Sequence, residues 1–214
     1  DLQEYAQATV AAEVGKLKNM RVSNGAALIT KPATGEILAM ISKPSFDPSN
    51  FLKAISSEMW KYMNDQETRP MTDRTLTGLY SPGSTFKPLV ALAALEERVL
   101  TPEFTVTCTG KIALGNHSFA CWKREGHGTV DLFKAITQSC DVYFYQVGMR
   151  VGVDALAQYA NKLGLGLKTE VELEHEKSGL IPTKEWKKKK YGVKWQDGET
   201  LSLAIGQGFN LVTP

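Results

Sequence analysis

The apolar positions along the chain predict several helices and one β-hairpin. Apolar residues recur at helical spacing in five segments, which predicts helices over 2–17, 51–63, 89–95, 132–148 and 153–163. Two short apolar runs, 26–30 and 37–42, flank a turn that contains Pro32 and Gly35, and this arrangement predicts a hairpin. Because both runs are apolar on each face, we expect helices to cover both sides of the hairpin.

The remaining segments are richer in polar and turn-forming residues. Residues 43–74, apart from the helix, and residues 102–130 show no sustained period, so we expect irregular connections there. The helix over 153–163 is expected to end at Gly164, and the chain becomes apolar again over 201–208. The lysine run over 187–190 is expected to form a solvated surface rather than a contact with an anionic partner.

A serine and a lysine stand at the start of an almost wholly apolar predicted helix. Pro82 and Gly83 break the chain, so we expect Ser84 at a helix N-terminus and Lys87 one turn along on the same face. A serine hydroxyl becomes a strong nucleophile only when a base removes its proton, and a lysine in a buried setting can act as that base. A capping serine followed by a surface lysine is the common alternative, but the buried helix behind the pair favours chemistry.

A second hydroxyl and a carboxylate lie within or beside the predicted helix over 132–148. Ser139 is suited to relay a proton if it hydrogen-bonds Lys87, and Asp141 is suited to hold either Lys87 or a substrate amide. The alternative is a capping serine and a surface aspartate at a helix start. The presence of the Ser84 motif favours the relay.

The cysteines and one histidine form a candidate metal site. Cys108, Cys121, His127 and Cys140 are separated by twelve, five and twelve residues, and three thiolates with one imidazole are a set that structural zinc prefers. Such a site uses all three cysteines and supports Ser139 and Asp141 from behind. The alternative is a Cys108–Cys121 disulfide with Cys140 buried. His117 and His175 have no partners at metal-ligand spacing, so we expect them to be surface residues.

Composition excludes several classes of function. The chain has 214 residues, of which 43% are hydrophobic and 22% charged, so we expect one globular domain or two small ones. The net charge of +2 does not indicate nucleic-acid binding. No apolar stretch is long enough for a membrane span, and there is no signal peptide. Because the chain starts at Asp1 without a methionine, we expect it to be a portion of a larger protein.

The motifs resemble a known family of enzymes. Residues 78–88 around Ser84 and residues 139–145 around Asp141 together resemble the transpeptidase domain of penicillin-binding proteins. Further stretches resemble more narrowly the class B subfamily called penicillin-binding protein 2, which works in cell elongation; they are 34–39, 44–48, 121–123, 126–128 and 205–208. The similarity covers essentially the whole chain. It implies an α+β fold, the penicillin-recognition fold of the serine β-lactamases, with helices on both faces of a five-stranded antiparallel sheet.

The resemblance also implies a role for each candidate residue. Ser84 would attack the D-alanyl-D-alanine carbonyl of a peptidoglycan stem peptide, and its own backbone N–H would be one donor of the oxyanion hole. Lys87 would act as general base, and Ser139 would relay the proton. An amine of a second stem peptide would then take the acyl group, whereas β-lactam antibiotics would leave the serine blocked.

The sequence departs from the family pattern in two ways. Asp141 stands where most of the superfamily has asparagine, so its contact with substrate must differ, although this variant suits the elongation subfamily. The third motif of the family, Lys-Thr-Gly, is absent, because Lys168-Thr169 is followed by Glu170 and comes too early. We therefore expect residues 1–214 to be the N-terminal portion of a transpeptidase domain, with only the first two strands of the central sheet and without the later strands, the pedestal domain and the membrane anchor.

The resemblance extends to a cofactor, to partners and to location. Some elongation enzymes carry zinc near the active site, with ligands that resemble Cys121, His127 and Cys140, while Cys108 is less securely aligned. The implied partners are peptidoglycan stem peptides, β-lactams and a glycan polymerase of the elongation machinery. The implied location is extracytoplasmic, on the periplasmic side of the inner membrane, with the full-length protein anchored in the membrane.

Other functions that share the serine and lysine stay open from the residues alone. A serine β-lactamase or a D,D-carboxypeptidase uses the same pair; the sequence shows no clear candidate for a deacylating glutamate, and loop residues such as Glu125 stay open for that role. A β-lactam-sensing or non-catalytic penicillin-binding domain is the alternative from another class. The stretches 121–122 and 126–128 favour the elongation enzyme over the sensor.

Overall fold

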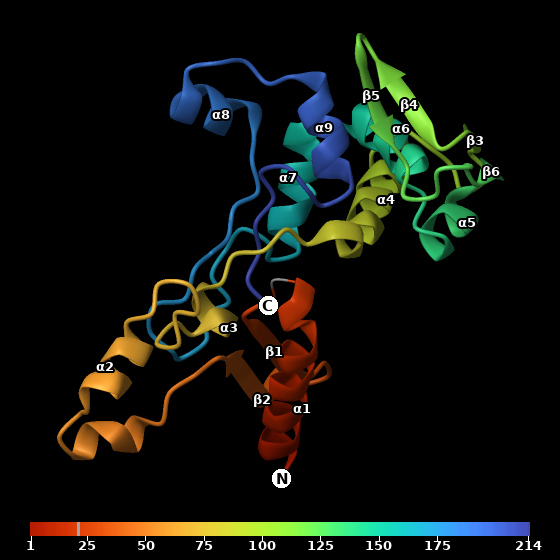
Figure 1. Ribbon diagram of the computed structural model, residues 1–214. Helices are drawn as coiled ribbons and strands as arrows, with labels where there is room; N and C mark the ends of the chain where they lie inside the picture. Colours follow the sequence, from red (N-terminus) through yellow and green to blue (C-terminus); the bar gives the residue numbers. More distant parts are fainter. Residues whose placement is uncertain (21) are drawn as a thin grey trace. The chain divides into compact units, whose positions relative to one another are not determined.

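The computed structural model describes residues 1–20 and 22–214, which form two compact units. The first unit contains Asp1–Leu79, Glu170–Lys177 and Thr213–Pro214, and the second contains Tyr80–Thr169 and Ser178–Val212 (Figure 1). Among the helices of the described residues, none is long and apolar enough to cross a membrane.

The first unit is built on the predicted hairpin and the N-terminal helix. Helix α1 (Leu2–Lys16) begins with a capping box between Asp1 and Glu4 and is followed by a 3-10 turn over Leu17–Met20. Strands β1 (Gly25–Lys31) and β2 (Glu36–Lys43) pair antiparallel, with a register shift between Ile29 and Thr30. The predicted helix and hairpin are therefore confirmed.

The core of this unit is small. Ala6 of α1 packs on Ala39 and Ile41 of β2, and the Gln3 side chain makes two 2.9 Å hydrogen bonds with the backbone of Met40. The expectation that helices cover both faces of the hairpin is wrong for part of it, because two apolar residues at the start of β2 are exposed, Ile37 and Leu38.

The helix predicted over 51–63 is broken in the structure. A 3-10 turn covers Pro48–Leu52, and α2 (Ser57–Met63) starts only after Ser56, whose hydroxyl accepts a hydrogen bond from the N–H of Met59. A capping serine competes with helix continuation because its side chain takes the place of the preceding turn. The segment ends in the short helix α3 (Arg74–Thr77).

The second unit packs its helices around α4 and α6. The helices are η3 (Gly83–Phe86), α4 (Lys87–Glu96), α5 (Leu132–Thr137), α6 (Asp141–Val151), α7 (Val153–Lys162), α8 (Lys184–Tyr191) and α9 (Asp197–Ala204). The fully buried side chains include Val90, Tyr143, Phe144, Leu156 and Leu201. Helix α9 lies very close to α6, since a Cβ added at Gly148 would stand 2.3 Å from the Cβ of Ala204.

Four short strands replace the irregular connection expected over 102–130. Strand β3 (Val106–Cys108) pairs antiparallel with β6 (Gly128–Val130), and β4 (Lys111–Leu114) pairs antiparallel with β5 (His117–Ala120). Strands of three or four residues are too short to give a readable alternation in the sequence. These strands position three of the four candidate metal ligands, Cys108, Cys121 and His127.

The lysine run is not uniformly solvated. It lies on α8, where Lys188, Lys189 and Lys190 are exposed, but Lys187 is only 6% exposed and forms an ion pair with Glu199 of α9. The prediction of a solvated surface is therefore wrong for Lys187. Its partner is too far along the chain for a helical spacing to reveal it.

Replacing Lys187 with methionine is expected to lower the free energy of unfolding by about 3 kcal/mol, because Glu199 is left partly buried without its partner. The double variant Lys187→Met/Glu199→Gln should recover most of this loss, since a neutral amide needs no counter-charge. Urea unfolding measures the free energy of unfolding of the single and the double variant. Lys189→Met, which alters an exposed lysine of the same run, is the matched control. If Lys187→Met lowers the free energy of unfolding no more than the control does, the ion pair does not stabilise the fold.

Candidate active site

The candidate nucleophile lies in a turn that leads directly into α4. Gly83 has a φ of 60° and begins the 3-10 turn η3, which continues without a break into the α-helix at Lys87. Ser84 is exposed, whereas Lys87 is 2% exposed. The prediction of a serine at a helix start, with a lysine one turn along, is confirmed.

A second glycine holds this turn from a distant part of the chain. The N–H of Gly83 donates a 2.8 Å hydrogen bond to the carbonyl of Gly206, just after α9. Gly206 has a φ of 71°, and a Cβ there would lie 2.1 Å from the carbonyl oxygen of Gly83. Only glycine allows this approach, so the conformation of the turn before Ser84 depends on residue 206.

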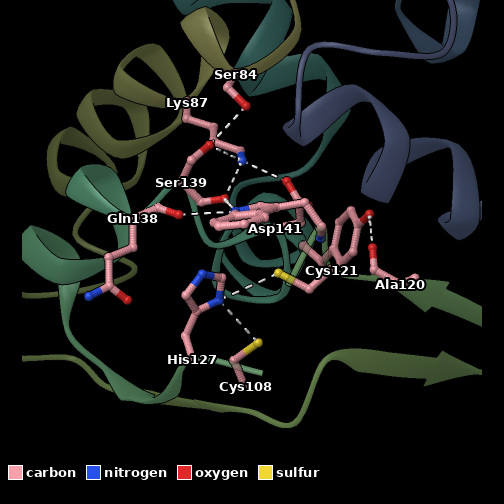
Figure 2. A network of polar contacts seen from close by, with 11 residues as sticks. Ser84, Lys87, Cys108, Ala120, Cys121, His127, Gln138, Ser139 and Asp141 are labelled. Carbon is pink, nitrogen blue, oxygen red and sulfur yellow. Dashed lines mark hydrogen bonds and ion pairs between the residues drawn. The ribbon is translucent and has the colours of Figure 1, made fainter. Parts of the chain in front are cut away.

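The second motif occupies a break between two helices. The single helix predicted over 132–148 is wrong, because α5 ends at Thr137 and α6 begins at Asp141. Ser139 lies between them with a φ of 53°, a left-handed conformation that a non-glycine residue rarely adopts. Such strain is typical of functional positions, and here it turns the Ser139 side chain toward Ser84 (Figure 2).

The two motifs are joined by a continuous series of hydrogen bonds (Figure 2). The Lys87 ammonium donates to Ser139 Oγ at 2.9 Å, to the Ser139 carbonyl at 2.9 Å and to Asp141 Oδ1 at 2.6 Å. Ser139 Oγ in turn donates to Ser84 Oγ at 2.9 Å. The lysine therefore uses all three of its donors, and the hydroxyl of Ser139 connects it to that of Ser84.

Trp122 completes this arrangement and was not predicted as a site residue. Its backbone N–H donates to Asp141 Oδ2 at 2.9 Å, and its indole N–H lies 3.1 Å from the carbonyls of both Gln138 and Ser139. Asp141 therefore bridges Lys87 and the Trp122 backbone. No spacing in the sequence relates residue 122 to the second motif, because the packing of strand β5 with helix α6 brings them together.

The four predicted metal ligands meet in one buried cluster. Cys108 ends β3, Cys121 follows β5, His127 precedes β6, and Cys140 caps α6. Their ligand atoms all lie within 4.8 Å of one another, and all four side chains are buried. His127 Nδ1 is 3.6 Å from the sulfur of Cys108 and 3.6 Å from that of Cys121 (Figure 2). The three cysteines are free, whereas His117 and His175 are exposed as expected.

The protonation of the cluster follows from its burial. Burial lowers the pKa of His127, and the nearby Lys123 ammonium lowers it further, so the imidazole is neutral at physiological pH. Burial raises the pKa of Cys140 to about 12. Burial also acts upward on the pKa of Cys108, but hydrogen bonds, chiefly from the backbone of Gly110, bring that pKa below its ordinary value. A neutral imidazole is the form that ligates a metal.

Comparison with known proteins identifies the family to which this site belongs. Residues 25–214 match the family model described as the penicillin binding protein transpeptidase domain. The chain belongs to this family. The fold of this transpeptidase domain is also that of solved relatives. A structure of penicillin-binding protein 2 from Pseudomonas aeruginosa, in complex with WCK 5153, is 40% identical with a TM-score of 0.83, and the match covers 94% of this chain and 46% of that chain.

Further relatives agree with this family assignment. Peptidoglycan D,D-transpeptidase MrdA of Haemophilus influenzae is 43% identical over 192 residues, which cover 89% of this transpeptidase chain and 30% of that protein. The Escherichia coli protein of the same name is 35% identical, with 100% of this chain and 32% of that protein covered. The chain thus spans about a third of the length of these curated relatives. A penicillin-binding protein 2 from Helicobacter pylori, solved as a complex with MreC, is 36% identical with a TM-score of 0.86. That match covers 96% of this chain and 38% of the Helicobacter chain.

Proposed function

We propose that this chain is part of a peptidoglycan D,D-transpeptidase of cell elongation, with Ser84 as its nucleophile. The observation that carries the proposal is the hydrogen-bonded series from Lys87 through Ser139 to Ser84 at the start of a helix. The names of the relatives, which are D,D-transpeptidases called MrdA, support the substrate class. The substrates are accordingly stem peptides that end in D-alanyl-D-alanine.

The geometry supports a two-step acyl transfer. In the first step Lys87 gives up the proton that it donates to Ser139 Oγ, Ser84 Oγ attacks the carbonyl of the penultimate D-alanine, and the proton of Ser84 passes through Ser139 to Lys87. The C–N bond to the terminal D-alanine then breaks, and the lysine returns the proton to that leaving amine. In the second step an acceptor amine forms a new C–N bond, the ester bond to Ser84 breaks, and the amine's proton goes back to Ser84 Oγ.

The other groups of the site position these reactants. Asp141 holds the Lys87 amine at 2.6 Å and keeps it directed at Ser139. The backbone N–H of Ser84 lies in the first turn of a helix, where N–H groups lack partners within the helix, and it would stabilise the oxyanion. A second oxyanion donor belongs to the Lys-Thr-Gly strand that the resemblance implies.

Acylation by a fluorescent penicillin tests the proposed nucleophile. The full-length protein should become covalently labelled on the peptide that contains Ser84, and Ser84→Ala should abolish the label because no other oxygen occupies that position. Ser81→Ala, which alters an exposed serine just before this turn, is the matched control and should label normally. Label that persists in Ser84→Ala would refute the assignment.

The stability of the label separates this function from its alternatives. A transpeptidase should acylate and then stall with nitrocefin, whereas a serine β-lactamase should turn it over. A D,D-carboxypeptidase would release D-alanine without forming crosslinks, and a sensing or non-catalytic domain would acylate without any crosslinking of stem peptides. Crosslinked product from the full-length enzyme therefore identifies the transpeptidase.

We further propose that Cys108, Cys121, His127 and Cys140 hold a structural zinc ion. Tetrahedral zinc, with bonds of about 2.3 Å to sulfur and about 2.0 Å to nitrogen, keeps such ligands about 3.5 Å apart. The observed 3.6 Å between His127 Nδ1 and each of two sulfurs fits this requirement. Four protein ligands leave no open position, so the metal would stabilise the fold and take no part in the reaction.

Zinc at this position would support the catalytic residues through the chain itself. Cys140 lies between Ser139 and Asp141, and Cys121 precedes Trp122, whose N–H binds Asp141. Binding of Cys121 and Cys140 to one ion would therefore fix the positions of Ser139 and Asp141, which both contact Lys87.

The location and partners follow from the substrate. Peptidoglycan lies outside the cytoplasm, so we place this domain on the periplasmic side of the inner membrane, in a full-length protein that is membrane-anchored. A glycan polymerase of the elongation machinery is the expected partner. One similar structure, 37% identical with a TM-score of 0.83, is described as coordinating polymerization and crosslinking in a peptidoglycan synthase complex, and the match covers 99% of this chain and 37% of that chain.

A further inference from the structure

A cavity of about 580 Å³ lies between the β4–β5 hairpin and the first turn of α9. Figure 1 shows these two elements beside each other within the second unit. The reaction proposed above uses none of the residues that line this cavity. Its volume falls within the range of sites for small ligands, about 300–1,000 Å³. The cavity is therefore large enough to hold a part of a substrate that the reacting groups do not touch.

Phe119 forms the apolar part of the wall. Its ring packs edge-on against Tyr145 at a centroid distance of 6.0 Å, which holds the ring in place. The tip of the ring meets Gly198, since a Cβ added there would lie 3.0 Å from Phe119 Cζ. Glycine is unfavourable inside a helix, but here it leaves room beside the ring that a larger residue would fill. The cavity thus has a fixed aromatic surface on which C–H groups can pack.

The first residues of α9 supply polar groups to the same cavity. Asp197 is exposed, and in the part of the chain that the structure describes its carboxylate makes no hydrogen bond or ion pair. The Gln196 side chain takes part in a capping box with Glu199 as an acceptor, and its amide N–H groups donate to no described residue. Free acceptors and free donors therefore lie close to one aromatic ring. Hydroxyl groups, which both donate and accept, satisfy both kinds.

The charge of the cavity excludes anionic ligands. No lysine or arginine lines it, whereas Asp197 and Glu199 do. Glu199 is paired with Lys187, so Asp197 supplies the unpaired negative charge. A phosphate or a carboxylate would be repelled from such a wall. An aromatic surface with a few free hydrogen-bonding groups and no lysine or arginine suits a neutral polyhydroxylated ring, which is a sugar.

Helix α9 connects this cavity with the turn that carries the nucleophile. The helix has eight residues, so it spans about 12 Å. The chain just after its end lies at this turn, because the carbonyl of Gly206 accepts the 2.8 Å hydrogen bond from Gly83. An extended peptide advances about 3.3–3.6 Å per residue, so about four residues cover this distance. A sugar in the cavity and a peptide carbonyl at Ser84 can therefore belong to one molecule.

We propose that this cavity binds a sugar of the glycan strand to which the donor stem peptide is attached. A C–H face of the sugar packs on Phe119, and its hydroxyl groups accept from Gln196 and donate to Asp197. Binding of this remote part of the substrate positions the peptide carbonyl at Ser84, and no bond is made or broken in the cavity. This inference rests on the proposed transpeptidase function and adds the glycan to the groups of the substrate that the domain recognises.

The test compares two donors that differ only in the sugar. One is a stem peptide that ends in D-alanyl-D-alanine, and the other is the same peptide attached to its disaccharide. Release of D-alanine by the full-length protein gives kcat/KM for each donor. The unmodified protein should show a value about tenfold higher for the donor with the sugar, because binding energy from the remote sugar lowers the barrier at the carbonyl. Asp197→Ala should reduce this ratio to about twofold or less.

Glu185→Ala is the matched control. It removes an exposed carboxylate from the first turn of another helix, α8, outside the cavity, and should keep the tenfold ratio. Thermal unfolding of each variant shows whether its fold is intact.

The proposed sugar site is overturned by a ratio near one in the unmodified protein. It is also overturned if Asp197→Ala leaves the ratio unchanged, or if Glu185→Ala reduces the ratio as much. Failure of the unmodified protein to release D-alanine from either donor and to label with a fluorescent penicillin would instead refute the proposed transpeptidase function. The two failures are therefore distinguishable.

Discussion

Replacement of Lys87 with methionine is expected to slow the acylation of Ser84 by a fluorescent penicillin by about a hundredfold to ten-thousandfold, the range for loss of a positioned general base. Methionine has a similar length and fills the buried space of Lys87, but it accepts no proton from Ser139. The acyl-enzyme ester would then form only as fast as the Ser84 hydroxyl loses its proton to water, which is slow. Stopped-flow labelling of the full-length protein measures the rate.

A structural effect of this change has to be separated from a chemical one. Lys87→Met also leaves Asp141 without its ion-pair partner, and the Asp141 side chain is only 13% exposed. The double variant Lys87→Met/Asp141→Asn removes that unpaired charge and should recover the thermal stability but not the acylation rate. Recovery of the rate along with the stability would contradict the role of Lys87 as base.

Loss of the proposed zinc ion is expected to have the second large effect. Native mass spectrometry of the full-length protein should show one bound zinc ion, which is lost on denaturation with the three thiols free. His127→Gln should lose the ion and acylate at least about tenfold more slowly, because the residues beside two ligands contact Lys87 or Asp141. The reason is positional, since His127 itself touches neither Ser84 nor Lys87.

The control for this experiment is His117→Gln, which alters an exposed histidine outside the cluster and should keep the ion. A metal-free chain two hydrogens lighter than expected would mean a disulfide, most simply Cys108–Cys121. That result would eliminate the zinc proposal while leaving the assignment of Ser84 as it is.

The chemistry-bearing residues could be predicted from the sequence because their motifs are local. Ser84 and Lys87 share one helical turn, and the cysteines and His127 form a set that metals prefer. The structure brings each group together within hydrogen-bond or ligand distance. The link between Asp141 and Trp122 could not be predicted, because it depends on how β5 and α6 pack.

Two errors have a common physical origin. The apolar pattern continues through residues 132–148, so it gives no sign of the left-handed Ser139 that divides α5 from α6. Likewise, the lysine run looks solvated because the burial of Lys187 depends on Glu199, which lies on another helix. The spacing of apolar residues indicates only the local structure, whereas contacts with distant residues determine the break at Ser139 and the burial of Lys187.

The contact between Gly83 and Gly206 bears on the order in which the site assembles during folding. The cluster ligands lie between residues 108 and 140, so this loop can close early. The turn that carries Ser84 reaches its final conformation only when the chain after α9 returns to accept the N–H of Gly83. We therefore expect the turn before Ser84 to reach its final conformation later in folding than the loop that contains the four cluster residues.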